Sequence, residues 1–247
     1  MRVPSLAACL LSPLSAQATE ISIGVMHQPP YMDEETRSGM FIDIIAEVLQ
    51  AAGHRAKPVF LPARRGVATF EDKQIDGLLF YVGDKGQGSC RTEMYGDYQP
   101  SLIALRKSAY AIKSFDDLTG RRVGAFLGAK EYFAPFYPDY VVALTKAADY
   151  REDDIVRITK LMLNGRMDIG VMDWRIFLWT AKADSQGNQY AMQEFEKYPV
   201  FQTAWVGAQF WKPEHCQDFD RGLAAIKANG RYEAIRKKYA EALGEGR

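Results

Sequence analysis

The sequence FDDLTGRRVGAFLGAKEYF, residues 115–133, indicates which fold the chain adopts. It begins with a short helical turn at Phe115–Leu118, which Thr119-Gly120 ends. Arg122–Phe126 is a brief apolar run typical of a buried strand, and a helix is predicted to begin at Gly128-Ala129. A buried strand followed at once by a helix is the repeating unit of a parallel α/β sheet.

The start of this predicted helix also suggests a binding site. The first backbone N–H groups of such a helix carry partial positive charge and point beyond the end of the strand. Gly128 therefore predicts a seat for a carboxylate or a phosphate. The other interpretation is that Gly128 only lets the strand and the helix pack closely, and the motif alone leaves both open.

Strands and helices also alternate on either side of this stretch, which predicts an α/β fold with two units. The polar, glycine-rich residues 83–96 predict a long functional or mobile loop. The chain is predicted to pass between the units at about residues 100–106 and 202–208. Strands are expected at 21–26, 57–61, 75–82, 140–144 and 167–172, and helices at 41–52, 64–73, 153–163, 173–182 and, as a pair separated near 229–230, at 214–243.

The composition is that of an ordinary globular chain, and it favours a small molecule as the ligand. Apolar residues make up 47% and charged residues 25%, which excludes a disordered or fibrous protein. The 31 basic and 31 acidic residues cancel, and no run of Lys or Arg longer than a pair is expected on a face that could track nucleic acid. We therefore expect no nucleic-acid partner.

Residues 1–18 have the pattern of a signal peptide. Arg2 precedes the apolar stretch Leu6–Leu14, and Ala16-Gln17-Ala18 has the small residues that a signal peptidase needs. Cleavage there would place residues 19–247 outside the cytoplasm. Leu6-Ala7-Ala8-Cys9 also resembles a lipoprotein box, which makes a lipid anchor the second interpretation.

Removal of Cys9 would leave two cysteines, Cys90 and Cys216, in an oxidising compartment. A disulfide and a pair of free thiols both remain open, because the sequence does not show how close the two residues lie. No metal site is expected, since His27, His54 and His215 are scattered and neither cysteine has a ligand partner at zinc spacing.

Several short motifs, spread over nearly the whole chain, resemble one family in their order and spacing. That family is the family 3 solute-binding proteins of bacterial ABC importers, the polar amino acid-binding group. Leu61-Pro62-Ala63-Arg64-Arg65 further resembles a subgroup whose ligands are mostly unassigned. The matching motifs are Pro29-Pro30-Tyr31, Gly39 with Phe41-Ile42-Asp43, Lys73-Gln74-Ile75-Asp76-Gly77, Arg91, Pro100, the FDDLTGRRVG block, Asn164-Gly165-Arg166-Met167-Asp168, Asp173, and Gly230-Tyr232-Ile235-Tyr239.

The resemblance implies a two-lobe periplasmic-binding-protein type II fold, with two hinge strands and the ligand cleft between the lobes. One lobe would comprise residues 19–104 and 207–247, and the other residues 105–206. A ligand that touches both lobes would favour the closed form, which an ABC transporter permease would recognise. The resemblance thus implies a periplasmic, monomeric binding protein without catalytic activity or cofactor, whose ligand is an amino acid or a related carboxylate.

The same resemblance suggests the ligand-binding residues. Arg91 would clamp a carboxylate, or else be a solvated loop residue. Asp173 would hold an ammonium group, cap the following helix, or do both. Tyr31 would stack on the ligand or plug the end of the first lobe. Three further candidates come from the strand end and the helix start: Tyr81, Gly128 and Lys130.

Departures from the family weaken the case for a standard α-amino acid. Gln28 and Ala63 stand where aromatic residues are common, and Ala129-Lys130 replaces a pair of hydroxyl residues. Phe80-Tyr81-Val82-Gly83 replaces a serine-rich strand end. Lys130 and Arg91 would suit an acidic ligand, whereas Glu131 and Asp173 would suit a zwitterion or a cation, so the ligand stays open.

Two other functions are compatible with the resemblance. The first is a lyase of the cyclohexadienyl dehydratase type, with Glu131 as general acid. The position of Glu131 at a helix start disfavours it, because that position stabilises the ionised carboxylate. The second is a ligand-sensing module for a separate membrane receptor.

Overall fold

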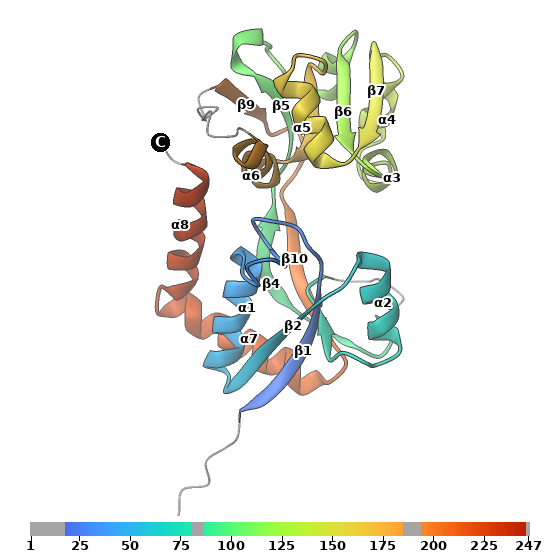
Figure 1. Ribbon diagram of the computed structural model, residues 1–247. Helices are drawn as coiled ribbons and strands as arrows, with labels where there is room; N and C mark the ends of the chain where they lie inside the picture. The colour runs from blue at the N-terminus through green and yellow to red at the C-terminus, as the bar shows by residue number, and fades with distance from the viewer. Residues whose placement is uncertain (1–17, 81–85, 185–193, 246–247) are drawn as a thin grey trace, which may run out of the picture.

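The chain forms two lobes, each built on a five-stranded sheet (Figure 1). This computed structural model describes residues 18–80, 86–184 and 194–245. The signal-peptide prediction for residues 1–18 falls almost entirely outside them, and Tyr81 lies outside them too. The expected α/β fold class, with two lobes, is confirmed.

The first lobe has the strand order β2-β1-β3-β10-β4. Strand β1 pairs in parallel with β2 and β3, and β10 pairs antiparallel with β3 and β4. Helices α1 and α7 contact each other on one face of the sheet, and α2 covers β1 and β3. The bounds are β1 Thr19–Val25, β2 His54–Phe60, β3 Gly77–Leu78, β4 Cys90–Tyr98, β10 Ala204–Phe210, α1 Met40–Ala51, α2 Ala63–Glu71, α7 Pro213–Ala228 and α8 Arg231–Leu243.

The second lobe has the strand order β7-β6-β8-β5-β9. Strand β6 pairs in parallel with β7 and β8, whereas β5 pairs antiparallel with β8 and β9. Two separate apolar clusters make up its core. The bounds are β5 Pro100–Leu105, β6 Arg122–Phe126, β7 Asp149–Asp153, β8 Ile169–Asp173, β9 Phe195–Tyr198, α3 Ala129–Phe133, α4 Pro138–Leu144, α5 Ile155–Leu163, α6 Trp174–Asp184, and the 3₁₀ turns η2 Arg106–Ser108 and η3 Phe115–Leu118.

Two passages join the lobes. Strand β4 of the first sheet ends at Tyr98, and β5 of the second sheet begins at Pro100. The chain returns between Tyr198 of β9 and Ala204 of β10. Both passages lie a few residues before the lobe boundaries expected at 104/105 and 206/207.

Some local predictions were wrong, and strands β7 and β9 were not predicted. Residues 140–144 belong to helix α4, which begins at Pro138, and proline favours the first helical turn. Residues 90–96, expected within a loop, belong to strand β4. Strand β7 was not predicted, because its sequence DYRED is polar, as suits the edge of a sheet.

Helix α8 forms a further contact between the lobes. It follows α7 of the first lobe and runs to α6 of the second, as Figure 1 shows. Leu243, near its end, is 1% exposed and packs in the core cluster of the second lobe. Lys182 of α6 also donates a hydrogen bond to the carbonyl oxygen of Ala242. The last turn of α8 is therefore anchored on the second lobe.

A group of buried charges lies where α8, β4 and α6 meet. Asp97 of β4 accepts hydrogen bonds from Arg175 Nη1 of α6 at 2.9 Å and from Arg236 Nη1 of α8 at 2.5 Å. Arg175 Nε also donates to Glu245 Oε2 at 3.2 Å. Burial opposes ionisation of Asp97, but the two guanidinium groups outweigh it, so the pKa of this carboxyl is below its usual value. We call these four residues the charge network.

Cys90 and Cys216 form a disulfide, which answers the question that the sequence left open. Their Cα atoms are 6.2 Å apart and they are separated by 126 positions in the sequence. Cys90 begins β4 and Cys216 lies in the second turn of α7. The disulfide therefore ties the strand that leads to the second lobe to a helix that comes after the chain returns.

The close contact between α1 and α7 depends on Gly222. A Cβ atom at this position would lie 2.1 Å from the carbonyl oxygen of Val48. We expect Gly222→Ala to lower the free energy of unfolding by about 2 kcal/mol, because the helices must move apart. This loss exceeds the gain of about 1 kcal/mol from the better helix propensity of alanine. Urea unfolding followed by circular dichroism measures the change.

The matched control for that substitution is Ala225→Ser, at an exposed position of the same helix. It should change the free energy of unfolding by less than about 0.5 kcal/mol. Equal stability of Gly222→Ala and the unmodified protein would show that the helix contact is not tight in solution.

Candidate ligand-binding cleft

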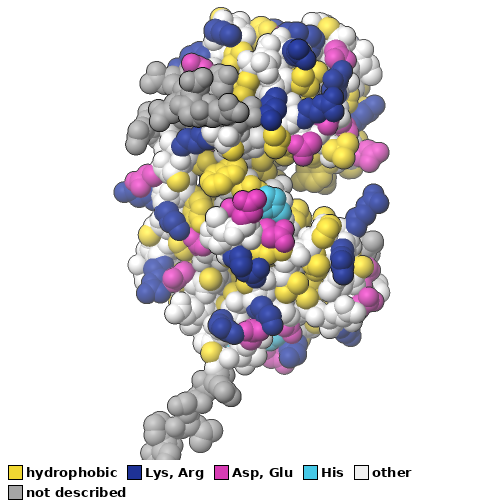
Figure 2. All heavy atoms as spheres, viewed as in Figure 1, with side chains coloured by type: hydrophobic (Ala, Val, Ile, Leu, Met, Phe, Trp, Pro, Cys, Tyr) yellow, Lys and Arg dark blue, Asp and Glu magenta, His cyan; other side chains and the backbone are white. Residues whose placement is uncertain are grey.

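A pocket of about 260 Å³ lies between the two lobes. Figure 2 shows that the molecule is hollowed between its lobes and that hydrophobic side chains gather around the hollow. Most of the lining is apolar or aromatic. The first lobe contributes Met26, Gln28, Met32, Leu79 and Phe80, the second contributes Phe126, Tyr132, Phe133, Ile155, Asp173 and Ile176, and the ends of the passages contribute Tyr98, Pro100 and Ala204.

Tyr31 and Asp173 connect the two lobes beside this pocket. Tyr31 is fully buried in the core of the first lobe, where its ring lies 4.4 Å from that of Phe41 and 4.7 Å from that of Tyr98. Its hydroxyl donates to the carboxylate of Asp173, at 3.0 Å from Oδ1 and 3.1 Å from Oδ2. Burial and the nearby carboxylate raise the pKa of Tyr31 well above its usual value, so the hydroxyl keeps its proton. Of the two roles predicted for Tyr31, the structure shows the plug.

Asp173 lines the pocket and caps helix α6. It is the last residue of β8, and its Oδ1 accepts from the backbone N–H of Ile176 at 2.9 Å, as an N-cap residue does. Its Oδ2 accepts from the backbone N–H of Gln99 at 2.5 Å. Burial raises the pKa of this carboxyl, although the two N–H donors and the charge of Arg175 favour ionisation. The predicted N-cap role is present, and the role toward a ligand stays a prediction.

Gln28 and Tyr98 place a second polar pair in the pocket. The Tyr98 hydroxyl donates to Gln28 Oε1 at 2.7 Å, which leaves the amide nitrogen of Gln28 as a donor toward the cleft. The sequence resemblance led us to expect an aromatic residue where this chain has Gln28, and Tyr98, at the end of β4, brings an aromatic ring to the same pocket. Tyr98 was not predicted as a site residue from the sequence.

The carboxylate-binding site predicted at the start of α3 is filled by a side chain of the protein itself. Gly128 takes the left-handed conformation, with φ 82°, and its N–H donates to Glu152 Oε2 at 2.9 Å. The backbone N–H of Lys130 donates to Glu152 Oε1 at 2.8 Å, and the Tyr150 hydroxyl donates to the same oxygen at 2.6 Å. Burial opposes ionisation of Glu152, but these hydrogen bonds outweigh it and lower its pKa. The carboxylate predicted to bind at Gly128 is thus a side chain of strand β7.

Arg91 is not among the residues that line this pocket. It is exposed, is the second residue of β4, and lies opposite Gln209. Its role as a carboxylate clamp stays a prediction. The side chain of Lys130 is exposed on α3 and does not line the pocket either.

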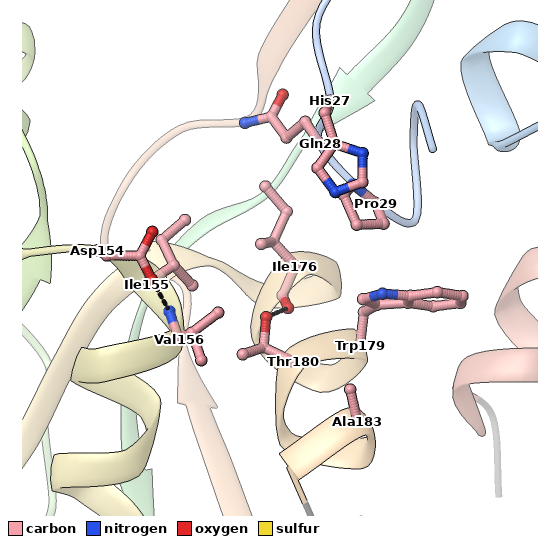
Figure 3. A pocket seen from close by; sticks show the side chains of 10 residues that line it. All are labelled: His27, Gln28, Pro29, Asp154, Ile155, Val156, Ile176, Trp179, Thr180 and Ala183. Atoms are coloured by element: carbon pink, nitrogen blue, oxygen red, sulfur yellow. Dashed lines mark hydrogen bonds between the residues drawn. The ribbon is translucent and has the colours of Figure 1, made fainter. Parts of the chain in front are cut away.

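A second pocket of about 370 Å³ adjoins the first. Figure 3 shows His27, Gln28 and Pro29 of the first lobe facing Ile176 and Trp179 of helix α6. Gln28 and Ile176 line both pockets, as does Ile155. The two pockets are therefore neighbouring parts of one cleft.

Two lobes joined by two passages, with a lined cleft between them, define a known architecture. This is the two-lobe periplasmic-binding-protein fold. No protein-family model matches the chain, and no curated protein matches it. Solved structures match it over almost its whole length.

An ancestral cationic amino acid solute-binding protein is similar, with a TM-score of 0.70 and 17% identity over 89% of this chain and 95% of that one. A histidine kinase sensor domain with similarity to periplasmic binding proteins has a TM-score of 0.66 and 16% identity, over 90% and 96% of the two chains. The second substrate-binding domain of a putative amino acid ABC transporter from Streptococcus pneumoniae has a TM-score of 0.64 and 19% identity, over 90% and 99%. At such identities the likeness establishes the fold.

The described residues offer neither a membrane-spanning helix nor a cluster of metal ligands. None of its helices is both long enough and apolar enough to span a bilayer. Within those same residues, no three His, Cys, Asp or Glu side chains are grouped so that they could hold a metal ion.

Proposed function

We propose that this protein is an exported, monomeric solute-binding protein that captures a small ligand in the cleft and delivers it to an ABC importer. The observation that carries the proposal is the pocket lined by both lobes, with Tyr31 and Asp173 hydrogen-bonded beside it. A ligand that contacts both walls favours the closed arrangement by its difference in affinity for the two forms. The similarity to solved structures of a solute-binding protein and of a substrate-binding domain supports this function.

Two features of the chain support export to the periplasm. Residues 1–18 have the signal-peptide pattern, and the disulfide suits an oxidising compartment. We further propose that the protein binds its ligand without changing it. Glu131, which a lyase would use as general acid, is exposed on α3 and is not among the residues that line the pocket.

A ligand-sensing role for a separate membrane receptor is the second candidate. The similarity to a histidine kinase sensor domain favours it. Permease and ATPase genes beside this gene would support delivery to an importer, whereas a histidine kinase gene would support sensing.

Capture in the cleft is tested with residues 19–247 by a thermal-shift screen against amino acids, amines, carboxylates and sugars. A ligand at 100 times its Kd should stabilise the protein by about 2.7 kcal/mol. Ala204→Trp places an indole in the pocket and should abolish the shift, and small-angle scattering should show a smaller radius of gyration for the liganded protein.

The matched control is Ala228→Trp, at an exposed position of α7 away from the residues that line the cleft. It should respond to the ligand as the unmodified protein does. Capture in the cleft is wrong if Ala204→Trp keeps the full shift, or if no compound in the screen binds.

A further inference from the structure

The cleft offers a ligand few charges and much apolar surface. Among the described residues that line the pocket of about 260 Å³, only Gln28, Tyr98, Tyr132 and Asp173 are polar, and none is Lys, Arg or His. The adjoining pocket adds the polar residues His27, Asp154 and Thr180. At about 260 Å³, this part of the cleft is smaller than most ligand pockets, and the adjoining part measures about 370 Å³. These side chains suit a compact apolar body better than a strongly hydrated one.

Aromatic rings form one wall of the pocket. Tyr132 and Phe133 of α3 both lie edge-to-face with Phe126 of β6, with ring centroids 6.1 and 5.8 Å away. Tyr132 is 54% exposed, so it still has ring surface to offer. Such rings can stack on a flat ligand and attract a cation over their faces.

The charge in this pocket is negative. Asp173 receives its hydrogen bonds from uncharged donors, the Tyr31 hydroxyl and two backbone N–H groups. Arg175, which acts on Asp173 through its charge, forms ion pairs with Asp97 and Glu245. A protonated amine in the pocket would therefore meet a carboxylate without a direct cationic partner.

Glu152 adds negative charge next to the pocket. It shares a neighbouring hollow with Phe126 and Ile155, which also line the cleft, and with Asp153 and Asp154. Its carboxylate takes the N–H groups of Gly128 and Lys130, so a ligand carboxylate cannot use them. A carboxylate that approached this wall would lack donors and would face a like charge.

We propose that Glu152 is a built-in carboxylate that excludes acids and α-amino acids, so that the cleft selects a small aromatic or apolar amine without a carboxylate. This inference rests on the proposed function and names the class of its ligand. It departs from the amino acid expected from sequence resemblance, and the departure follows from the pairing of β6 with β7, which brings Glu152 to the start of α3.

Three probes with the same phenyl group test the selection. Phenethylamine carries the amine, L-phenylalanine carries both charges, and 3-phenylpropionate carries only the carboxylate. Isothermal titration of residues 19–247 should show phenethylamine binding at least tenfold more tightly than L-phenylalanine, and 3-phenylpropionate binding most weakly. This ranking needs no variant, so a folding defect cannot obscure it.

Glu152→Ala tests which residue is responsible. Loss of the carboxylate should free the two N–H groups and reduce the preference for phenethylamine over L-phenylalanine at least tenfold. Glu152→Gln, which keeps the size but removes the charge, should reduce it less. Asp149→Ala, at an exposed position of the same strand, is the matched control and should leave the preference unchanged.

The outcomes separate this inference from the proposed function. Tighter binding of L-phenylalanine or 3-phenylpropionate than of phenethylamine would overturn the inference while supporting capture in the cleft. So would a carboxylate as the strongest ligand in the broader screen, or an unchanged preference in Glu152→Ala. Failure of every probe and every compound in that screen would overturn the proposed function itself.

Discussion

Asp97→Ala is expected to lower the free energy of unfolding by about 3 to 5 kcal/mol, the cost of leaving buried charges without their partner. Asp97 is 2% exposed and is the shared acceptor of Arg175 and Arg236 in the charge network. Its loss leaves Arg236 without this partner and Arg175 with a single ion pair, to Glu245, among those seen in the described residues. Urea unfolding, followed by tryptophan fluorescence and by circular dichroism, measures the change.

The matched control is Asp153→Ala, which removes an ion pair with Arg157 on the surface of the second lobe. Exposed pairs contribute little, so this change should cost less than about 1 kcal/mol. The charge network joins elements of both lobes, so Asp97→Ala should also make the two probes report different midpoints. Equal losses in the two variants would show that burial adds nothing to the strength of the network.

Replacing both Cys90 and Cys216 with serine is expected to cost about 4 to 5 kcal/mol. The bond closes a segment of the chain that spans 126 positions, and long closed segments restrict the unfolded chain most. The readout is the urea midpoint of the unmodified protein and of the double variant, each with and without a reducing agent.

The reducing agent should bring the unmodified protein close to the double variant and leave the double variant unchanged. The double variant is thus its own control for effects of the reagent. A midpoint of the unmodified protein that does not respond to reduction, although free thiols appear, would contradict the expected contribution.

Local signals in the sequence predicted much of the fold. The apolar spacing of residues 41–52 and the break near Asn229-Gly230 correctly indicated α1, α7 and α8. Helix α4 was mistaken for a strand because Val141 and Val142 favour strands. What holds these residues in a helix is the packing of Tyr140 and Ala143 in the core of the second lobe, which the local sequence does not reveal. Strand β7 carries no apolar pattern that would predict it. It is a strand because it pairs with β6 at the edge of the sheet.

The candidate site was harder to predict, because its polar contacts join distant segments. The sequence indicated that Gly128 could hold a carboxylate, but not that Glu152, paired through β7, would supply it. Asp173 was predicted correctly as a helix cap, since that contact is local. Arg91 was placed by analogy, and it lies in strand β4, which the sequence did not predict to extend back to Cys90.

The anchoring of α8 has a mechanical consequence for the motion of the lobes. Two covalent passages define an axis about which one lobe can swing, and the attachment of α8 to α6 restrains that rotation. The lobes can rotate freely only if the Leu243 side chain leaves the core cluster of the second lobe or shifts along α6. Helix α8 would then slow the opening of the cleft, and the rate of ligand entry would be limited by the rate at which its last turn detaches from the second lobe.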